Sequence, residues 1–584
     1  MHLSYSISKY KGKTYKSYAI AESYRMGEKV KKRTIWPIGK LTEVQAKQVQ
    51  LICKVIKDDN QILANLNDLV VKETKAYLDI ALIDAIWQHW KLDAAFQIGV
   101  TESCLSTPLI AKILTINRCL DPCSHYSVPK WVKSTALADV LKTDLSVLND
   151  DKLYYELDKI EQNKESIETH LFHQTFMNNA ISYQYINYDL STSYFVGYKC
   201  KLSAFGKGKI ECHGRRQVLL GVLINDEGYP FKWDVFTGNT AEVTTLKHNI
   251  EACRTRFKLN DSDVTMVFDR GIISEENASL IESAQMKFIS ALDRNQIPGC
   301  GFNLLVFENI CDDPPKDFHK YDEDLFFSDA GILDGQRLIV GFNPVLFRED
   351  RSSRQEKIQF FETYIQNENL GLQNAKRDRN HDTTKNRIVW ELKRLKLKKY
   401  YHDPILHPIK VSNTLKDGSI KWIDSFKIEI QINSETLAAE KLLDGVCVFV
   451  SNHIEKQGKS FKLKAIQIIR AYREKTKIED VFKNVKSFLK IRPFFVNTES
   501  HVKAVYTICM ISYFINRFLA NRRREIGEKD YLNSKELYAP FRDIDHVVLE
   551  DKSTGKIIRK SVELPKSTRK LLQQIGMEHI AAGT

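Results

Sequence analysis

The sequence predicts an α/β protein, α+β overall, whose centre is a mixed sheet flanked by helices. Residues 181–298 contain three strand-like runs in succession, after which helices and strands alternate, an order typical of such a sheet. Residues 46–180 show helical periodicity instead, which is clearest at residues 77–90. Because a chain of 584 residues is too long for one hydrophobic core, we expect about three to five structural units.

Composition and charge are those of a globular protein with a polyanionic partner. The 87 Lys and Arg residues outnumber the 74 Asp and Glu residues, which gives a net charge of +13 and weakly favours DNA as that partner. The 11 cysteines form no C-x-x-C pair, which indicates reduced thiols in a cytoplasmic protein. We expect neither a secretory leader nor a membrane span. The first residues are polar, and residues 504–520 contain Asn516 and Arg517, which predicts a buried helix there and not a membrane-spanning one.

Residues 1–45 predict a small basic β region of three short strands, with turns at residues 11–12 and 27–28. Few acidic residues offset its cations, which are Lys11, Lys13, Lys16, Arg25, Lys29, Lys31, Lys32 and Arg33. A DNA-binding region and a solvated β-meander explain this charge equally well.

The helical residues 46–180 contain one cluster of residues that could bind a metal ion. Cys119, Cys123 and His125 lie close together in the sequence. Because a structural zinc site needs four ligands and no fourth one is near, a purely structural role is favoured for these three residues.

The first candidate catalytic residue is Asp189, in the stretch QYINYDLSTSY at residues 184–194. The aromatic and β-branched residues before Asp189 predict a strand, which we expect to end there because Ser191 and its small polar neighbours follow. A carboxylate at the end of a buried strand is rigid and reaches solvent, as a metal ligand must. For a single aspartate, however, a turn cap is the commoner explanation.

Residues 181–298 otherwise predict alternating elements. We expect strands at residues 183–189, 194–201, 217–225, 264–269 and 287–292, and helices at 243–257 and 274–285. The strand at 264–269 (VTMVFD) also ends on an aspartate, Asp269, and Gly271 follows it. A second carboxylate at a strand end strengthens the case for a site that binds metal ions.

Residues 471–490 predict one amphipathic helix, because Ile478, Phe482, Val485 and Leu489 recur at helical spacing. At about 100° per residue, a neighbouring stripe carries four polar residues: Tyr472, Lys475, Glu479 and Lys486. An ordinary surface helix would show such a pattern too, so the stripe gains weight only together with the two aspartates.

Together these stretches resemble the DDE transposases of bacterial insertion sequences, in the subclass with the signature Tyr-x2-Arg-x3-Glu-x6-Lys. The spacing of the four polar residues matches this signature, and the resemblance extends over about residues 121–519. One departure is Lys475, which stands where the family has Arg and lacks the planar fork that grips a phosphate with two bonds. The adjacent Arg473 could partly compensate.

The resemblance implies a ribonuclease-H-like catalytic core formed by residues 181–298 and 446–520. The long chain between Asp269 and Glu479 implies a β-rich insertion at residues 299–445 that grips DNA. By the same resemblance, residues 46–180 recognise the ends of the element. Residues 521–584 form a polar tail.

The resemblance also implies the site and its partners. Asp189, Asp269 and Glu479 would be the catalytic metal ligands, holding two Mg²⁺ ions for which Mn²⁺ can substitute. Residues expected to bind DNA are Tyr472, Arg473, Lys475, Lys486, Arg270, Arg215 and Arg216. The partners would be double-stranded DNA, as element ends and target, and a second copy of the chain in a homodimer. The function would be cut-and-paste transposition, with DNA cleavage at the terminal inverted repeats and strand transfer.

Two alternatives to an active transposase remain: a catalytically inactive DNA-binding descendant, and a nuclease on the same fold. The presence of all three acids argues against the first, and the polar helix and the insertion argue against the second. Within the insertion, Trp390 and Trp422 are candidates for stacking on a displaced base, although packing in a core is the favoured interpretation of both.

Overall fold

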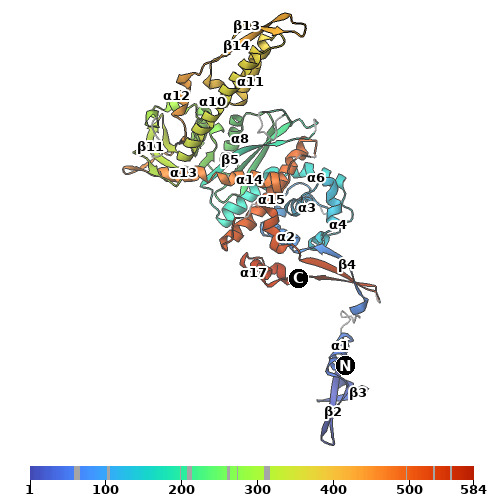
Figure 1. Cartoon of the computed structure of the whole chain (residues 1–584). Coiled ribbons are helices and arrows are strands. Elements are labelled where there is room, and N and C mark those ends of the chain that lie inside the picture. The colour runs from blue at the N-terminus through green and yellow to red at the C-terminus, as the bar shows by residue number, and fades with distance from the viewer. Residues whose placement is uncertain are drawn as a thin grey trace. The chain divides into compact units, whose positions relative to one another are not determined.

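The computed structural model describes most of the chain: residues 1–57, 66–100, 105–196, 199–206, 214–259, 264–272, 274–307, 316–492, 494, 496–530, 533–552 and 555–583. The chain forms two compact units, which can be followed by residue number in Figure 1. The first unit comprises Met1–Leu82, Lys130–Thr143 and Ala539–Thr584, and the second comprises Ile83–Pro129 and Asp144–Tyr538.

The first unit contains two small antiparallel sheets. The N-terminal sheet has the order β1-β2-β3, with strands His2–Tyr10, Lys13–Met26 and Lys29–Gly39. The three strands expected here are confirmed. The other sheet has the order β19-β18-β4, with strands Lys556–Ser561, Asp545–Asp551 and Leu69–Ala76. Part of the predicted polar tail therefore forms a sheet with a strand from the N-terminal part of the chain.

The second unit is built on a sheet whose central part has the order β7-β6-β5-β8-β9. These strands are Pro230–Thr237, Gln217–Ile224, Tyr185–Tyr194, Thr265–Phe268 and Lys287–Ala291. Strands β5, β6 and β7 pair antiparallel, whereas β5 with β8 and β8 with β9 pair parallel. Three antiparallel strands extended by two parallel ones are the ribonuclease-H-like arrangement, and the predicted mixed α/β fold is confirmed.

Strand β5 differs from its predicted form. It does not end at Asp189 but continues to Tyr194, paired with β6 throughout, and the expected separate strand at residues 194–201 is absent from the described residues. Ser191 and Ser193 lie inside β5 and are 6% and 0% exposed. β5 is a central strand, so its backbone is paired and the packing above it is close. Small side chains fit this position, although they would break an exposed strand.

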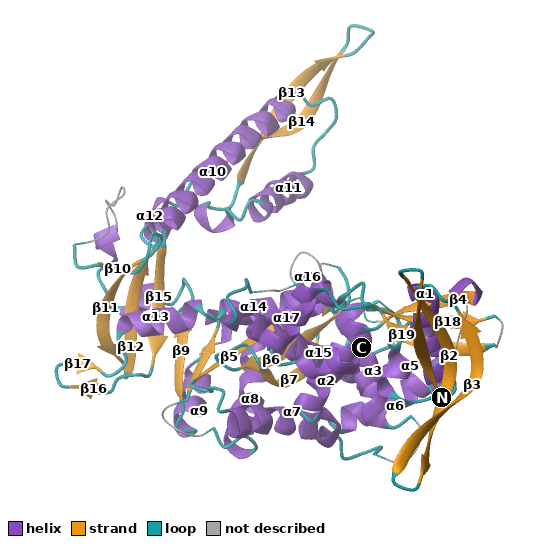
Figure 2. Cartoon of the chain, turned by 90° about the horizontal axis from the view of Figure 1, so that it is seen from below, coloured by secondary structure: helices purple, strands orange, loops and turns teal. Residues whose placement is uncertain are grey.

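Helices cover both faces of this sheet, as Figure 2 shows. One face packs on α8 (Glu242–Thr255) and α9 (Glu275–Ser283) through residues such as Phe268 and Ile281. The other face packs on α13 (Ala465–Arg473) through Val267, Ile468 and Ile469. Adjacent residues of β8 therefore point into opposite cores, as the two-residue repeat of a strand requires.

The long helix α15 (Glu499–Glu525) is buried along most of its length. Trp233 of β7 donates a hydrogen bond to Thr507 of α15 at 3.0 Å, and α15 also packs on α3 (Thr107–Leu120) and α6 (Asp150–Gln162). The buried helix expected at residues 504–520 is thus confirmed. In the part of the chain that the structure describes, no helix is long and apolar enough to cross a membrane.

The remaining elements are short helices and strands of the two units. The helices are α1 (Glu43–Val55), α2 (Leu78–His89), α4 (Val128–Lys133), α5 (Leu137–Leu141), α7 (Lys164–Phe172), α12 (Ser434–Lys441), α14 (Thr476–Lys483), α16 (Ser534–Tyr538) and α17 (Lys566–Gln574). The strands are β16 (Lys456–Gln457) and β17 (Ser460–Phe461).

The segment between the two parts of the catalytic core extends the sheet. Beyond β9 the strand order continues β15-β12-β11-β10, with strands Val446–Ser451, Gln336–Phe342, Phe326–Leu333 and His319–Lys320. All these added pairs are antiparallel. Figure 2 shows them continuing the sheet past β9, so the insertion is part of the sheet that carries the site.

Between β12 and β15 the chain forms a helical arm, residues 344–432. The arm consists of α10 (Pro344–Gln373), α11 (His381–Arg394) and the hairpin of β13 (Ile405–Thr414) and β14 (Ile420–Glu429). It has a core of its own, which includes Phe361 and Ile428. Trp390 and Trp422 do not join that core. The favoured interpretation that they pack in a core is wrong, because they are 61% and 63% exposed.

A buried ion cluster fastens the arm to the sheet. The Asp444 carboxylate is 0% exposed and accepts hydrogen bonds from Arg354 Nη1 at 3.0 Å and Arg294 Nη2 at 2.8 Å. Arg351 Nε lies 3.5 Å from the same carboxylate. One buried acid thus links guanidinium groups of α10 to a guanidinium group of the loop after β9, and removing its charge would leave the buried Arg354 unpaired.

We predict that Asp444→Asn lowers the free energy of unfolding by about 3–5 kcal/mol, because it leaves the buried Arg354 guanidinium without its counter-charge. Urea unfolding of the second unit, followed by tryptophan fluorescence, measures this. The matched control is Asp382→Asn at the start of α11, where the side chain is 88% exposed, and a change below about 0.5 kcal/mol is expected there. If the two variants are equally stable, the ion cluster around Asp444 does not stabilise the fold.

Candidate active site

The parallel pairing of β5 and β8 places two predicted catalytic residues side by side. Tyr188 of β5 pairs with Phe268 of β8, and Asp189 and Asp269 each come one residue later. Neighbouring strands lie about 4.8 Å apart, and residues at equivalent positions of parallel strands point to the same face. Two residues far apart in the sequence therefore place their carboxylates on one face of the sheet.

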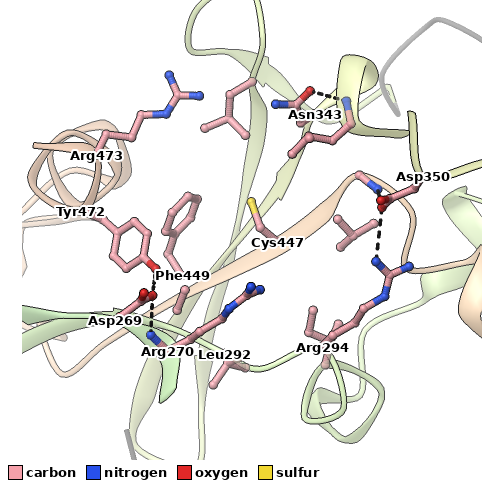
Figure 3. A pocket seen from close by; sticks show the side chains of 16 residues that line it. Asp269, Arg270, Leu292, Arg294, Asn343, Asp350, Cys447, Phe449, Tyr472 and Arg473 are labelled. Carbon is pink, nitrogen blue, oxygen red and sulfur yellow. Dashed lines mark hydrogen bonds and ion pairs between the residues drawn. The ribbon is translucent and has the colours of Figure 1, made fainter. Parts of the chain in front are cut away.

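The Asp269 carboxylate is surrounded by donors, two of which are shown in Figure 3. Its Oδ1 accepts hydrogen bonds from the Tyr472 hydroxyl at 3.1 Å and from the Arg270 backbone N–H at 2.8 Å, and Lys475 Nζ lies 3.1 Å away. Burial raises the pKa of Asp269, but the Lys475 charge and these hydrogen bonds outweigh burial and lower that pKa below its ordinary value. Asp269 is therefore an ionised carboxylate at neutral pH.

Tyr472 remains a protonated donor. Burial and, next, the Asp269 charge raise the pKa of its hydroxyl, because ionisation would place a second negative charge beside the first. Its ring packs edge-on against Phe449 of β15 with the centroids 5.3 Å apart. The hydroxyl is thus held in place and points at Asp269.

The helix expected at residues 471–490 is divided in the structure. Helix α13 ends at Arg473 and α14 begins at Thr476, and between them the Lys475 N–H bonds to the Tyr472 carbonyl at 3.3 Å. This tight turn alters the predicted stripe, since it brings Tyr472 and Lys475 onto the same oxygen of Asp269. Local hydrogen bonding of this kind leaves no trace in hydrophobic periodicity.

Lys486 lies over the other aspartate strand. It belongs to a π-helical segment, Asn484–Phe488, that continues α14, and its Nζ donates to Ser191 Oγ at 2.5 Å. Ser191 is two residues after Asp189 on β5, so both side chains are on the same face. Three of the four polar residues of the predicted stripe, Tyr472, Lys475 and Lys486, thus contact the strands of the aspartates or Asp269 itself.

Glu479 lies on α14, which packs against β5, and its side chain is exposed. Among the described residues, no group of three or more His, Cys, Asp and Glu side chains is close enough together to hold a metal ion. The structure therefore brings Asp189 and Asp269 together without the third acid, and the assignment of Glu479 as a ligand stays a prediction.

The four predicted arginines have different surroundings. Arg473 forms an ion pair with Asp322 and lies over the ring of Tyr321, and in Figure 3 it points away from Asp269. Arg270 follows Asp269 directly and is 62% exposed, with Asp293 at 3.9 Å. Arg473 is thus held by neighbours, whereas Arg270 reaches solvent beside the aspartates.

Arg215 and Arg216 lie just before β6, opposite the far end of β5. Arg216 donates to the Ser203 carbonyl at 2.6 and 3.2 Å and to its hydroxyl at 3.0 Å, so it fixes the loop that contains Ser203. Arg215 is exposed and lies over the Tyr194 ring at 5.0 Å. Tyr194 is five residues beyond Asp189, about 17 Å along the strand, so neither arginine touches the aspartates.

A cavity of about 520 Å³ opens beside Asp269. Figure 3 shows Cys447, Phe449 and Leu292 lining it, with cationic side chains around them. Arg294 and Asp350 of this cavity were not predicted from the sequence. Arg294 comes three residues after the end of β9, so a polar residue shortly after a buried strand was the available signal. Asp350 lies in α10 and gave none.

Comparison with protein families assigns this fold and site to a known class. A model described as the transposase DDE domain matches residues 199–515, which is more than half of the chain and includes Asp269 and Glu479. The chain therefore belongs to the DDE transposases, which cleave DNA, transfer DNA strands and depend on divalent metal ions. Residues 3–66 match the N-terminal domain of IS1634 family transposases, and the resemblance to insertion-sequence transposases is confirmed. No curated protein sequence matches the chain.

The solved structures that the chain matches include three transposase complexes. A piggyBac transposase synaptic complex with hairpin DNA is 9% identical and has a TM-score of 0.35, over 80% of this chain and 79% of that one. A Mos1 paired-end complex with the left transposon end is 12% identical, and a pre-cleavage Mos1 transpososome is 11% identical. Both have TM-scores of 0.14, over 33% of this chain and 60% of theirs.

We predict that Lys475→Met raises the pKa of Asp269, because burial then acts without the neighbouring cation. The depressed pKa means that the ion pair stabilises the folded chain at pH values above 3.8 and loses this effect as the pH falls through the lowered pKa. Carbon-13 NMR of labelled aspartate carboxyls, without divalent ions and assigned with Asp269→Asn, measures the shift. Lys483→Met, an exposed lysine of α14, is the control, and an unchanged Asp269 pKa in Lys475→Met would contradict the ion pair.

Proposed function

We propose that the chain is an active transposase that binds the terminal inverted repeats of its insertion sequence and moves it by cut-and-paste transposition. The observation that carries this proposal is the adjacency of Asp189 and Asp269 on parallel strands, with Tyr472, Lys475 and Lys486 gathered on the same strands. Two carboxylates with cations and a phenol beside them suit a site at which a phosphodiester is cleaved.

The proposed metal ligands are Asp189, Asp269 and Glu479, and the proposed ions are two Mg²⁺, with Mn²⁺ able to substitute. The two aspartates fit such ions, because carboxylate oxygens are the donors that these cations prefer and Asp269 already holds the positive charge of Lys475 at its Oδ1. When bound, the ions would supply charge screening for the phosphate, an activated attacking oxygen and a stabilised leaving oxygen.

The side chains around the aspartates have separate tasks in this proposal. Tyr472 keeps its proton and offers a hydrogen bond to a phosphate oxygen. Lys475 is a compact point charge on a flexible stem, so it can turn from Asp269 to a phosphate without the fixed geometry that a guanidinium requires. Lys486 holds a phosphate over β5, and the exposed Arg270 draws the DNA backbone toward the site.

DNA binding outside the site is proposed for several regions. The basic sheet of residues 1–45 and the helical residues 46–180 would bind the element ends, and the insertion, residues 299–445, would grip DNA near the cut. Exposed Trp422 on the β13–β14 hairpin and Trp390 on α11 suit stacking on a displaced base. Arg215 would contact the backbone, while Arg216 positions the adjacent loop. A homodimer would hold two ends together.

A catalytically inactive DNA-binding descendant is the second candidate. The observation in its favour is the position of Glu479, which the described structure does not gather with the two aspartates. In this alternative the aspartates and cations would survive as a surface that binds DNA without cutting it.

We predict that Glu479→Gln abolishes Mg²⁺-dependent cleavage of DNA that contains an element end, by on the order of 10³-fold, because the lost metal ligand is worth several kcal/mol in the transition state. Gel assays of wild type and variant with Mg²⁺ and with EDTA measure cleavage, and a shift assay in EDTA should show equal DNA binding.

The control is Glu525→Gln, an exposed glutamate at the end of α15, which should cut like wild type. Wild-type activity of Glu479→Gln would remove Glu479 from the site. A wild-type chain that binds but never cuts would favour the inactive descendant, and cutting without joining to target DNA would favour a nuclease.

A further inference from the structure

A second cavity, of about 370 Å³, lies in the catalytic unit and shares no lining residue with the cavity at Asp269. One wall comes from the end of α3 and the loop after it, between residues 118 and 125. The other comes from residues 490–492, 494 and 496, after the π-helical turn, with Val505 of α15. It contains Cys123 and His125, two residues of the cluster for which a metal site was considered.

The cavity is cationic. Arg118, Lys490 and Arg492 line it, and none of the described lining residues is acidic. Arg118 is 9% exposed, and its Nη1 donates to the backbone carbonyls of Leu489 and Lys490 at 3.4 and 3.3 Å. These bonds hold a buried guanidinium at the cavity wall, and a guanidinium is a group that binds phosphate well.

His125 provides an independent sign of a ligand. Its side chain is 5% exposed and lines the cavity. Within the described residues no hydrogen bond reaches its ring, whose centroid lies 5.7 Å from that of the Tyr154 ring. Burial, and then the charges of Arg118 and His501, lower the pKa of His125 to about 3. A neutral imidazole offers one donor and one acceptor, and buried groups of this kind normally have partners.

Lys490 has an unusual backbone at the rim of the cavity. Its φ is 47°, in the left-handed region that residues with a side chain seldom occupy. Such conformations are found disproportionately at ligand sites. Lys490 thus combines this unusual backbone with one of the three positive charges of the cavity.

The rest of the lining is apolar: Pro122, Ile491, Phe494, Val496 and Val505. A ligand with an anionic group at the three cations and a flat, weakly polar body in the apolar part would use both parts of the lining. A nucleotide has this shape and chemistry, and the volume is within the range of about 300–1,000 Å³ of small-ligand sites.

The cavity also lies on the continuation of the catalytic strand. Phe494 forms a β-bridge with Phe195, the residue directly after β5. Phe195 is six residues beyond Asp189, about 20 Å at the rise of a strand, and Lys490 comes four residues after Lys486 in the sequence. A DNA strand that reaches the aspartates is therefore within a few nucleotides of this cavity.

We propose that this cavity binds a nucleotide, with its phosphate at Arg118, Lys490 and Arg492 and its base in the apolar part of the cavity. His125 donates or accepts a hydrogen bond with the bound nucleotide. A nucleotide within a DNA strand and a free mononucleotide share this chemistry, and the DNA source rests on the proposed function while the free one does not.

The test compares two lysines that share one backbone conformation. Lys490→Asn removes the charge and keeps the left-handed backbone, which Asn tolerates. Lys258→Asn is the matched control, because Lys258 has a φ of 54°, is exposed and lies outside the cavity. The probes are dAMP, by calorimetry, and end-containing duplex DNA, by fluorescence anisotropy at several salt concentrations, all in EDTA.

We expect Lys490→Asn to weaken binding of one or both probes by about tenfold, as for a lost hydrogen bond to a charged group, with Lys258→Asn unchanged. If Lys490→Asn loses affinity for DNA alone, with a salt-dependence slope reduced by about one, the cavity binds a nucleotide of the DNA strand. If it also loses affinity for dAMP, the cavity binds free nucleotides too. Equal affinities of Lys490→Asn and wild type for both probes would overturn the proposal, as would equal losses in the two variants.

A second variant separates binding from packing. His125→Phe keeps a buried ring and removes its polar atoms, so we expect weaker nucleotide binding without loss of thermal stability. If His125→Phe binds both probes like wild type, the nucleotide site is refuted. All these binding measurements are made in EDTA and do not depend on catalysis. A chain without Mg²⁺-dependent cleavage would therefore contradict the proposed function but not the nucleotide site.

Discussion

The pairing of β5 with β8 is the constraint on which the site depends. It holds Asp189 and Asp269 at equivalent positions of neighbouring strands, and two carboxylates so close repel each other unless positive charge is supplied. In the structure that charge comes from Lys475 at Asp269 and from Lys486 over β5. The helices that carry these lysines are in turn fixed by apolar contacts, such as those of Ile468 and Ile478.

Periodicity and strand-end polarity predicted the parts of the fold that local sequence determines. Strands β6, β8 and β9, the buried helix α15 and the carboxylate after β8 are where these patterns placed them. Three features depended on tertiary contacts instead: the continuation of β5 through Ser191 and Ser193, the turn between α13 and α14, and the pairing of β4 with β18. A small polar residue breaks an exposed strand but fits a crowded central one, and no local pattern distinguishes the two.

The sequence resemblance places Lys475 where the related signature has an arginine, and the surroundings of Lys475 suit a lysine. A lysine ammonium is compact, so it meets a single oxygen of Asp269 at 3.1 Å and shares that oxygen with the Tyr472 hydroxyl. A guanidinium prefers to span both oxygens of a carboxylate. The exchange therefore leaves the second oxygen of Asp269 more accessible, while Arg473 is occupied by Asp322 and Tyr321 and does not take the place of the missing fork.

The insertion contributes strands to the same sheet, and this limits how the chain can evolve. Strand β15 closes the edge of β9 through Phe449, Val450 and Ser451, and β12 closes that of β15. A shortened descendant without residues 299–445 would lose β12 and leave a buried apolar strand with an open row of amide and carbonyl groups. Such edges recruit other chains and promote aggregation. A shortened chain that remains soluble must therefore keep β12 and β15, the two strands between which the arm lies.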